Sequence, residues 1–186
     1  MASDFQFDEA KTTQAACLLL KLRHGRMHYL KLLKLLYLAD REALLRWGIP
    51  ITWDQYVSMD NGPVPSQAYN LVVEDIPKPN WNRHISPPMG DYEVELINSP
   101  AETNLLSRAE ENLIQEIYQE YGAWNRWQLV DMVHSLPEWR NPHGSTIPIT
   151  HRDILQAGGN SGPEIQDILT ELDAAAKGRK ILSGTA

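Results

Sequence analysis

The chain has 186 residues, 42% of them hydrophobic and 22% charged, values typical of a soluble globular protein with a real core. This length favours one compact domain, and no apolar run approaches the roughly 20 residues that cross a bilayer. The first residues lack the basic start of a secretory signal, and the single cysteine, Cys17, lies in the apolar stretch AACLLL. We therefore expect a cytoplasmic protein with a buried, unreactive thiol.

The formal net charge of −7 is unevenly distributed along the chain. Residues 1–50 hold eight Lys and Arg against five Asp and Glu, whereas residues 51–186 hold nine against nineteen. Nucleic-acid binders usually concentrate basic residues on one face, because phosphate contacts dominate their affinity. The stretch KLRHGRMHYLKLLK (21–34) could form such a face or a solvated helical stripe. The acidic remainder makes nucleic acid an unlikely partner and better suits a basic protein.

Two helices are predicted at the start of the chain. Residues 8–23 have an acidic first turn and a basic last turn, which complement the helix dipole. Residues 27–46 form a helix that is apolar over most of its circumference, and such a helix belongs in the centre of a fold. Its narrow polar strip consists of Lys31, Lys34 and Arg41. Gly48 and Pro50 predict its end.

A small antiparallel sheet is predicted after the central helix. Residues 51–60 are rich in β-branched and aromatic residues and are expected to form a strand or extended arm. DYEVELI (91–97) alternates apolar and acidic residues, as a half-buried strand does. Its expected hairpin partner is RHIS (83–86), with PPMG (87–90) as the turn.

Between these strands lies the corner GPVPSQAY (62–69), where the chain reverses. Gly62 tolerates a positive φ, and Pro63 fixes φ near about −65° and has no N–H to donate. A short helix is expected at 67–73. The corner could support the central helix and bury Tyr69 against it, or it could hold a binding surface rigidly, which reduces the entropy lost on docking.

The last part of the chain is predicted to be helical. Capping-box signatures at Ser107 and Asn125 each begin a helix. Behind them follow a short helix at 148–157, a GGNSG linker at 158–162, and a helix from Pro163 with a frayed tail at 177–186.

These elements predict a mainly helical α+β protein. A helical bundle surrounds the central apolar helix at about 27–46, and a small antiparallel sheet or hairpin is inserted at about 51–97. Residues 1–157 are expected to form a single domain, and residues 158–186 a linker with a C-terminal helix and tail.

No local motif provides a positive argument for catalysis. The sequence contains no GxSxG, HExxH, P-loop or GxGxxG pattern. His24 and His28 have a spacing that can bind a metal, but Gly25 separates them and no acidic third ligand follows. His134 is interpreted as a helix-end histidine bonded to a carbonyl or carboxylate. We expect no catalytic residue, cofactor or metal; a hydrolase built on the histidines is the alternative.

Three stretches together resemble one protein family. They are KLLKLLYLADREAL followed by GIPIT (31–52), GPVPSQAY (62–69) and LVDMVHSLPEW (129–139). Their order and spacing are similar to the Panacea domain, also described as the SocA-like antitoxin domain or the phage-associated GepA-like family, over about residues 10–155. The positions that carry the resemblance are Lys31, Leu32, Lys34, Leu35, Tyr37, Gly48, Pro50, Ile51, Gly62, Pro63, Val64, Tyr69, His134 and Trp139. Met-Asp-Asn before the corner and the order Pro-Glu-Trp depart from the commoner family pattern.

The resemblance implies a bacterial antitoxin of a toxin–antitoxin system that neutralises a cognate protein toxin by direct contact and carries no catalytic residues. One alternative is a protease adaptor, or a phage-associated interaction protein, that delivers a bound partner for degradation. Another is a nucleic-acid-binding regulator that uses residues 21–34.

Aromatic residues in the acidic part of the chain are candidates for contacting the partner, because aromatic anchors often dominate interface energetics. The candidates, with one polar neighbour, are Trp53, Tyr56, Asn61, Trp81 and Tyr92. The alternative for the aromatics is a second core of the fold itself. Tyr37 and Tyr69 are predicted to be mostly buried, with Leu33 and Leu36 in the main core.

Overall fold

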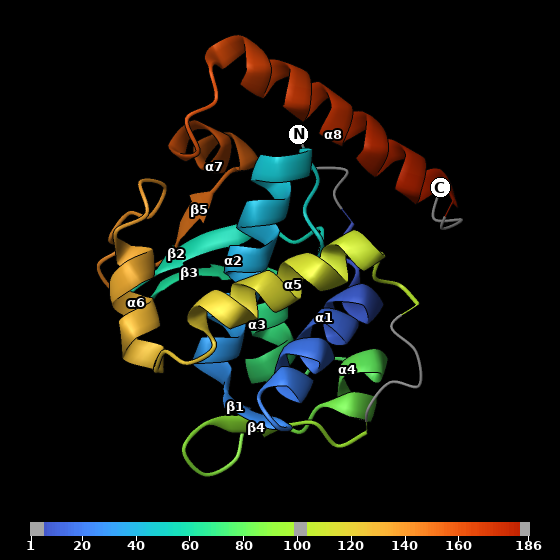
Figure 1. Cartoon of the computed structure of the whole chain (residues 1–186), viewed down its shortest axis with the longest axis vertical. Helices are drawn as coiled ribbons and strands as arrows, with labels where there is room; N and C mark the ends of the chain where they lie inside the picture. Colours follow the sequence, from blue (N-terminus) through green and yellow to red (C-terminus); the bar gives the residue numbers. More distant parts are fainter. Residues whose placement is uncertain (1–5, 99–103, 183–186) are drawn as a thin grey trace.

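The computed structural model describes residues 6–98 and 104–182, and these form a mainly helical fold with two small antiparallel sheets (Figure 1). The helices are α1 (Glu9–Leu22), α2 (Tyr29–Trp47), α3 (Ser66–Val73), α4 (Pro79–His84), α5 (Arg108–Tyr121), α6 (Arg126–His134), α7 (His151–Ala157) and α8 (Gly162–Leu182). The strands are β1 (Arg26–His28), β2 (Tyr56–Met59), β3 (Gly62–Pro65), β4 (Glu93–Glu95) and β5 (Ile147–Ile149). The expected fold class is confirmed.

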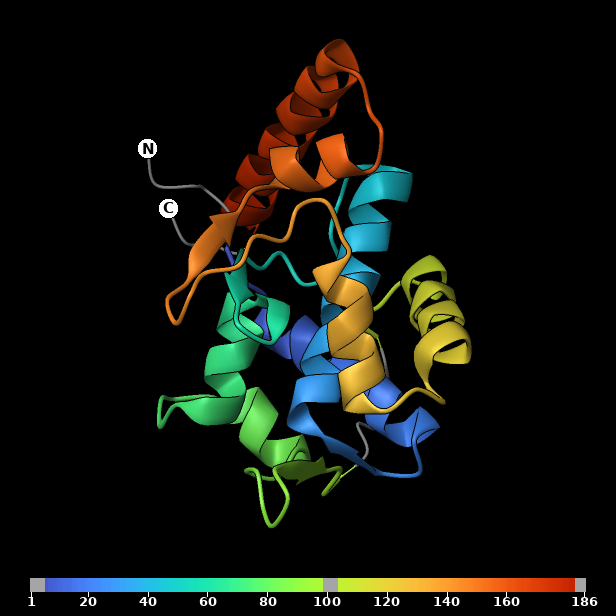
Figure 2. The same ribbon diagram turned by 90° about the vertical axis from the view of Figure 1, so that its left-hand side faces the viewer.

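Helix α2 is the centre of the molecule. Helices α1, α5, α6 and α7 and strand β3 all pack against it, and Figures 1 and 2 show α5 and the β2–β3 hairpin on different sides of it. Residues 31–40 are all buried, so the predicted core positions Leu33, Leu36 and Tyr37 are confirmed. The predicted polar strip is wrong for Lys31 and Lys34, because both side chains are buried and bond to backbone carbonyls.

The ends of α2 are set by local contacts. The helix begins at Tyr29, two residues later than predicted, because residues 26–28 form β1. The Nδ1 atom of His28 accepts a hydrogen bond from the N–H of Leu30 at 3.1 Å and caps the first turn. Gly48 ends α2 in the left-handed conformation, as the sequence predicts.

The two sheets differ in part from the predicted single sheet. One contains β1 and β4, and the other has the order β3–β2–β5. Strand β4 confirms the predicted strand at 91–97 over a shorter range, but its ladder partner is β1. The predicted partner 83–86 is partly helical, because α4 extends to His84. Residues 85 and 86 still pair with the other side of the β4 segment, through an isolated bridge between Ile85 and Leu96 and a hydrogen bond from the N–H of Ser86 to the carbonyl of Glu95 at 2.9 Å.

The C-terminal helix packs on the rest of the fold. Helix α8 lies beside α7 and covers the end of α2 near Gly48, and it buries Ile165, Leu172 and Ala176 (Figures 1 and 2). Residues 177–182 are helical and correct the predicted frayed tail; its remainder, 183–186, lies outside the described residues. Among the described helices, none has the length and apolar character needed to cross a membrane.

Candidate functional site

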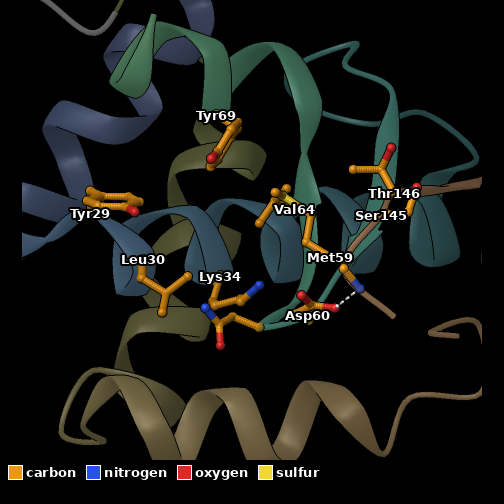
Figure 3. Close-up of a pocket in the computed structure, with 12 residues that line it drawn as sticks. Tyr29, Leu30, Lys34, Met59, Asp60, Val64, Tyr69, Ser145 and Thr146 are labelled. Atoms are coloured by element: carbon orange, nitrogen blue, oxygen red, sulfur yellow. Dashed lines mark hydrogen bonds between the residues drawn. The ribbon is translucent and has the colours of Figure 1, made fainter. Parts of the chain in front are cut away.

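A cleft of about 380 Å³ opens at the corner that the sequence singled out. Its walls come from the first turns of α2, the β2–β3 hairpin, α3, and the loop before β5 (Figure 3). The lining residues are Tyr29, Leu30, Lys34, Met59, Asp60, Asn61, Gly62, Val64, Tyr69, Gly144, Ser145 and Thr146. The cleft therefore brings together segments more than a hundred residues apart in the sequence.

The hairpin under the cleft needs a glycine at position 62. Gly62 has φ +92° and pairs with Met59 across the turn between β2 and β3. A Cβ atom at this position would lie 2.5 Å from Cγ2 of Val133 on α6 and 3.3 Å from Nζ of Lys34. Both the backbone conformation and the close approach of α6 therefore exclude a side chain at this position.

Lys34 is the buried cation of the cleft. Its Nζ atom donates a hydrogen bond to the carbonyl oxygen of Pro63 at 2.7 Å, which ties α2 to β3. Burial lowers the pKa of Lys34 to about 7, since the ammonium form is poorly solvated there. Among the described residues, no carboxylate forms an ion pair with Lys34, so the bond to Pro63 offsets only part of this cost.

The segment after α6 fixes the hairpin from behind. The ring of His134 stacks on Trp139 with centroids 4.0 Å apart, and the Nε1 atom of Trp139 donates to the carbonyl of Met59 at 3.1 Å. The backbone N–H of Arg140 donates to Oγ of Ser58 at 3.2 Å. The predicted bond from His134 to a carbonyl or carboxylate is not formed at Nε2, which is buried with no partner among the described residues.

A buried carboxylate connects this segment to α2. Glu138 Oε1 accepts hydrogen bonds from the hydroxyl of Tyr37 at 2.9 Å and from Nε of Arg41 at 2.6 Å. Burial, and then the nearby Glu138 carboxylate, raise the pKa of Tyr37 well above its ordinary value, so its hydroxyl stays protonated and donates. The carboxylate charge is thus paired in the interior.

Two further buried aspartates hold the chain segments just before and just after the hairpin. Asp40 accepts from the N–H groups of Ile51 and Thr52, and also from the hydroxyls of Thr52 and Tyr56. Asp54 accepts from the N–H groups at the start of α3, Gln67 at 2.9 Å and Ala68 at 2.8 Å. Burial raises the pKa of Asp40 to about 6 and that of Asp54 to about 7. The hydrogen bonds oppose this effect because they stabilise the carboxylate form.

Sequence reasoning missed both aspartates and Glu138. Asp40 carried a signal, because it interrupts an otherwise apolar helix at a position facing the interior. Asp54 and Glu138 carried none, since their partners lie on other elements of the fold.

The predicted partner-binding aromatics are placed mostly in the interior. Trp53, Tyr56 and Trp81 are 4%, 2% and 1% exposed, so the expectation that they form a surface is corrected. The physical reason is that other parts of the fold cover these rings. For example, Cζ of Arg179 on α8 lies over the ring of Trp53, 4.6 Å from the ring centroid. These rings form part of the core, the alternative that the sequence left open.

Two of the five predicted residues do reach the surface. Asn61 is exposed in the cleft. Tyr92 is 64% exposed, and its ring packs edge-on against Tyr29, which lines the cleft. Tyr69, predicted to be mostly buried, is only partly buried because one side of its ring faces the cleft (Figure 3).

The basic stretch 21–34 is only partly available as a basic face, with Lys21 and Arg23 exposed. Lys31 and Lys34 are buried, and Arg26 forms ion pairs with Glu93 and Glu95 at 3.0 and 3.1 Å. Over residues 6–98 and 104–182, no three His, Cys, Asp or Glu side chains are grouped as a metal site.

The fold and the site together define a class of mainly helical domain. In this class a hairpin with a Gly-Pro-Val corner packs on a buried central helix and is bonded to a lysine of that helix. Residues 32–140, more than half of the chain, match the family model described as antitoxin SocA-like, Panacea domain. The chain belongs to this family. The match includes all of the cleft except the Tyr29–Leu30 edge and the 144–146 loop, and it is shorter than the predicted range of about 10–155. No curated protein and no solved structure matches the chain.

Proposed function

We propose that this protein is an antitoxin that acts in the cytoplasm and neutralises a cognate protein toxin by binding it directly. Membership of the antitoxin SocA-like family is the observation that supports the proposal. The action proposed is binding, without a catalytic residue, cofactor or metal.

The rim of the cleft is the proposed contact surface. It offers the exposed Asn61 together with the partly exposed rings of Tyr29, Tyr69 and the neighbouring Tyr92. Tyrosines give large contact areas at low cost in side-chain entropy. The hairpin below them is fixed by α2 and by the segment after α6, so little ordering is needed when a partner docks.

The charge distribution supports a basic toxin. Residues 51–186 carry ten more acidic than basic residues, so a positively charged partner would be attracted over a distance. Association should accordingly slow when the salt concentration is raised, because counter-ions screen this attraction.

Co-expression with the product of a neighbouring gene that is toxic when expressed alone tests the proposal. We expect the wild-type protein to restore growth and to co-purify with the toxin. Asn61→Arg places a large charged side chain at the cleft rim and should abolish neutralisation with an unchanged thermal midpoint. Gln119→Arg is the matched control, because it makes a similar change on the exposed face of α5. It should neutralise like wild type.

Two results would count against the proposal. A wild-type protein that neither binds nor rescues from the toxin is not an antitoxin for it. If Asn61→Arg still neutralises the toxin, the contact surface lies elsewhere on the molecule.

A further inference from the structure

We propose that the cleft is a binding site for a ligand carboxylate, which is held by the ammonium group of Lys34. The isolated protein should bind this ligand whether or not it neutralises a toxin. Two observations support this proposal. Lys34 is fully buried and lines the cleft, and the neutral polar side chains that line it too make no side-chain hydrogen bonds within the described part of the protein.

The hydrogen bonding of Lys34 is incomplete within the described protein. A lysine ammonium has three N–H donors, and only the carbonyl of Pro63 receives one of them. A cation in this position costs free energy unless an anion or further acceptors approach it. The cleft is the side from which such a group can arrive, because Lys34 lies at its floor (Figure 3). Since Lys34 is 0% exposed, neighbouring side chains must move slightly aside for a ligand to reach its ammonium group.

Lys31, three residues earlier on the same helix, shows what a purely structural lysine looks like here. Its Nζ atom donates to the carbonyls of Gly122 and Trp124, both at 2.7 Å, where α5 has ended. Two carbonyls at a helix end are the expected partners of a capping cation. Lys34 has only one such acceptor among the described residues, and it lines a cleft. A carboxylate bound in the cleft would supply the acceptor that Lys34 lacks and Lys31 has.

The other walls of the cleft offer neutral donors around Lys34. The hydroxyl groups of Tyr29, Tyr69, Ser145 and Thr146 and the side-chain amide of Asn61 all line it. None of these groups makes a side-chain hydrogen bond to another described residue. Figure 3 shows Tyr29 to one side of Lys34 and Ser145 and Thr146 to the other, with Tyr69 on α3 facing α2.

The charged residues that line the cleft favour a ligand with a single negative charge. Lys34 is the one cation among the lining residues, and Asp60 lines the same cleft with its carboxylate held by the N–H of Gly144 at 2.9 Å. A doubly charged phosphate would be repelled by Asp60 and matched by only one cation. A carboxylate carries one charge and accepts several hydrogen bonds from one side, which suits a lysine surrounded by hydroxyls.

The remaining walls indicate the rest of the ligand. Leu30, Met59 and Val64 contribute apolar surface beside the polar groups. A volume of about 380 Å³ is at the small end of ligand sites, which span roughly 300–1,000 Å³. The ligand class is therefore a monocarboxylate with a short apolar substituent, as in an acylated amino acid or the last residue of a polypeptide.

Protonation of Lys34 should be linked to this binding. Its pKa is lowered to about 7 by burial, and a bound carboxylate favours the ammonium form. Binding should therefore tighten as the pH falls through neutrality, until the carboxylate itself is protonated. The other titratable groups near Lys34 are Asp60, His134, Tyr29 and Tyr69.

Titration of the isotope-labelled full chain by NMR tests the proposal. The probe is N-acetyl-leucine, and its amide, N-acetyl-leucinamide, is the control that lacks only the charge. We expect the acid to shift the backbone signals of residues 60–64 and 144–146 saturably, and the amide to bind at least tenfold more weakly. Loss of a charge-assisted hydrogen bond corresponds to about a 10- to 100-fold change. A peptide ending in leucine, with a free or an amidated C-terminus, then distinguishes a chain end from a small molecule.

The variant Lys34→Met removes the charge and keeps the length of the side chain. It should bind the acid at least tenfold more weakly, with a thermal midpoint equal to or above that of wild type. Lys31→Met is the matched control: it should lower the midpoint and leave acid binding unchanged. If Lys34→Met does not fold, Tyr69→Phe removes one hydroxyl donor and should weaken acid binding several-fold. Equal binding of acid and amide, wild-type affinity in a folded Lys34→Met protein, or no saturable shift would each overturn the proposal.

Discussion

Buried polar residues of this protein bond to the backbone at places where regular structure ends. Lys31 takes carbonyls beyond the end of α5, and Asp54 takes the N–H groups at the start of α3. Asp40 takes the N–H groups of Ile51 and Thr52 just after α2. A buried backbone group without a partner costs free energy, so each of these side chains makes one local chain path more favourable than its alternatives.

Gly62 is expected to be intolerant of even the smallest side chain. Gly62→Ala should reduce the free energy of unfolding by about 2–4 kcal/mol, because it adds a contact with Val133 to an unfavourable positive φ. Urea denaturation measures the loss. Gly144→Ala is the matched control, with φ +83° but no atom within 4 Å of the new Cβ. It should lose only about 1–2 kcal/mol. Equal losses in the two variants would show that the contact with Val133 does not matter.

Lys34 should make stability depend on pH in a predictable direction. Its pKa is about 7 in the folded protein and 10.5 ordinarily, so between these values the unfolded chain holds a proton that the folded chain has released. The stability conferred by this residue therefore rises with pH, by at most about 1.4 kcal/mol per unit. Urea unfolding of wild type and Lys34→Met at several pH values from 7 to 10 measures the difference. Parallel curves for the two proteins would contradict the prediction.

At the scale of single residues, sequence periodicity predicts which side chains are buried better than it predicts which polar groups they bond to. Leu33, Leu36 and Tyr37 follow from the apolar pattern of the helix. The same pattern assigns Lys34 to a polar face, because it does not show that β3 brings a carbonyl to this lysine. Asn61 was predicted as a site residue from its place near the corner, whereas the buried tryptophans were chosen for their residue type and their place in the acidic part of the chain.

A few buried contacts join elements that are far apart in the sequence. The clearest are the bonds of Glu138, which connect the segment after α6 to α2. Glu138→Gln should reduce the free energy of unfolding by about 3–5 kcal/mol, because Arg41 would keep a largely buried charge without a carboxylate. Glu116→Gln is the control: its ion pair with Arg46 is exposed and should contribute about 0–1 kcal/mol. Thermal or urea unfolding separates the two. A loss below about 1 kcal/mol for Glu138→Gln would show that this pair does not hold α2 to the segment after α6.

Elements with local signals were predicted, and elements defined by distant partners were not. The capping boxes at Ser107 and Asn125 are formed by residues within one turn, and both helices begin where predicted. Strands β1 and β5 have three residues each and gain their strand character from pairing with β4 and β2. A sequence window that contains only one partner cannot show such a pairing.

For the molecule as a whole, we expect α8 to belong to the same folding unit as the family-matched region. It lies outside residues 32–140, and a linker was predicted before it. Its contacts point to one unit, because Ile168 approaches Gly48 at the end of α2 and Arg179 pairs with Asp8 at 3.0 Å. Arg179 also covers the ring of Trp53, which the family match includes.

Truncation of a buried leucine in α8 tests this unity. Leu172 is 0% exposed and Leu36, in the centre of α2, is 1% exposed. If α8 unfolds together with the core, Leu172→Ala should lower the free energy of unfolding by about 2–5 kcal/mol, as Leu36→Ala should, with one transition in both variants. Leu182→Ala is the control, because this side chain is almost fully exposed and its loss should change stability by less than about 0.5 kcal/mol. Circular dichroism during urea unfolding gives these values. An early separate transition in Leu172→Ala, with the main transition unchanged, would show instead that α8 is an independent attachment to the domain.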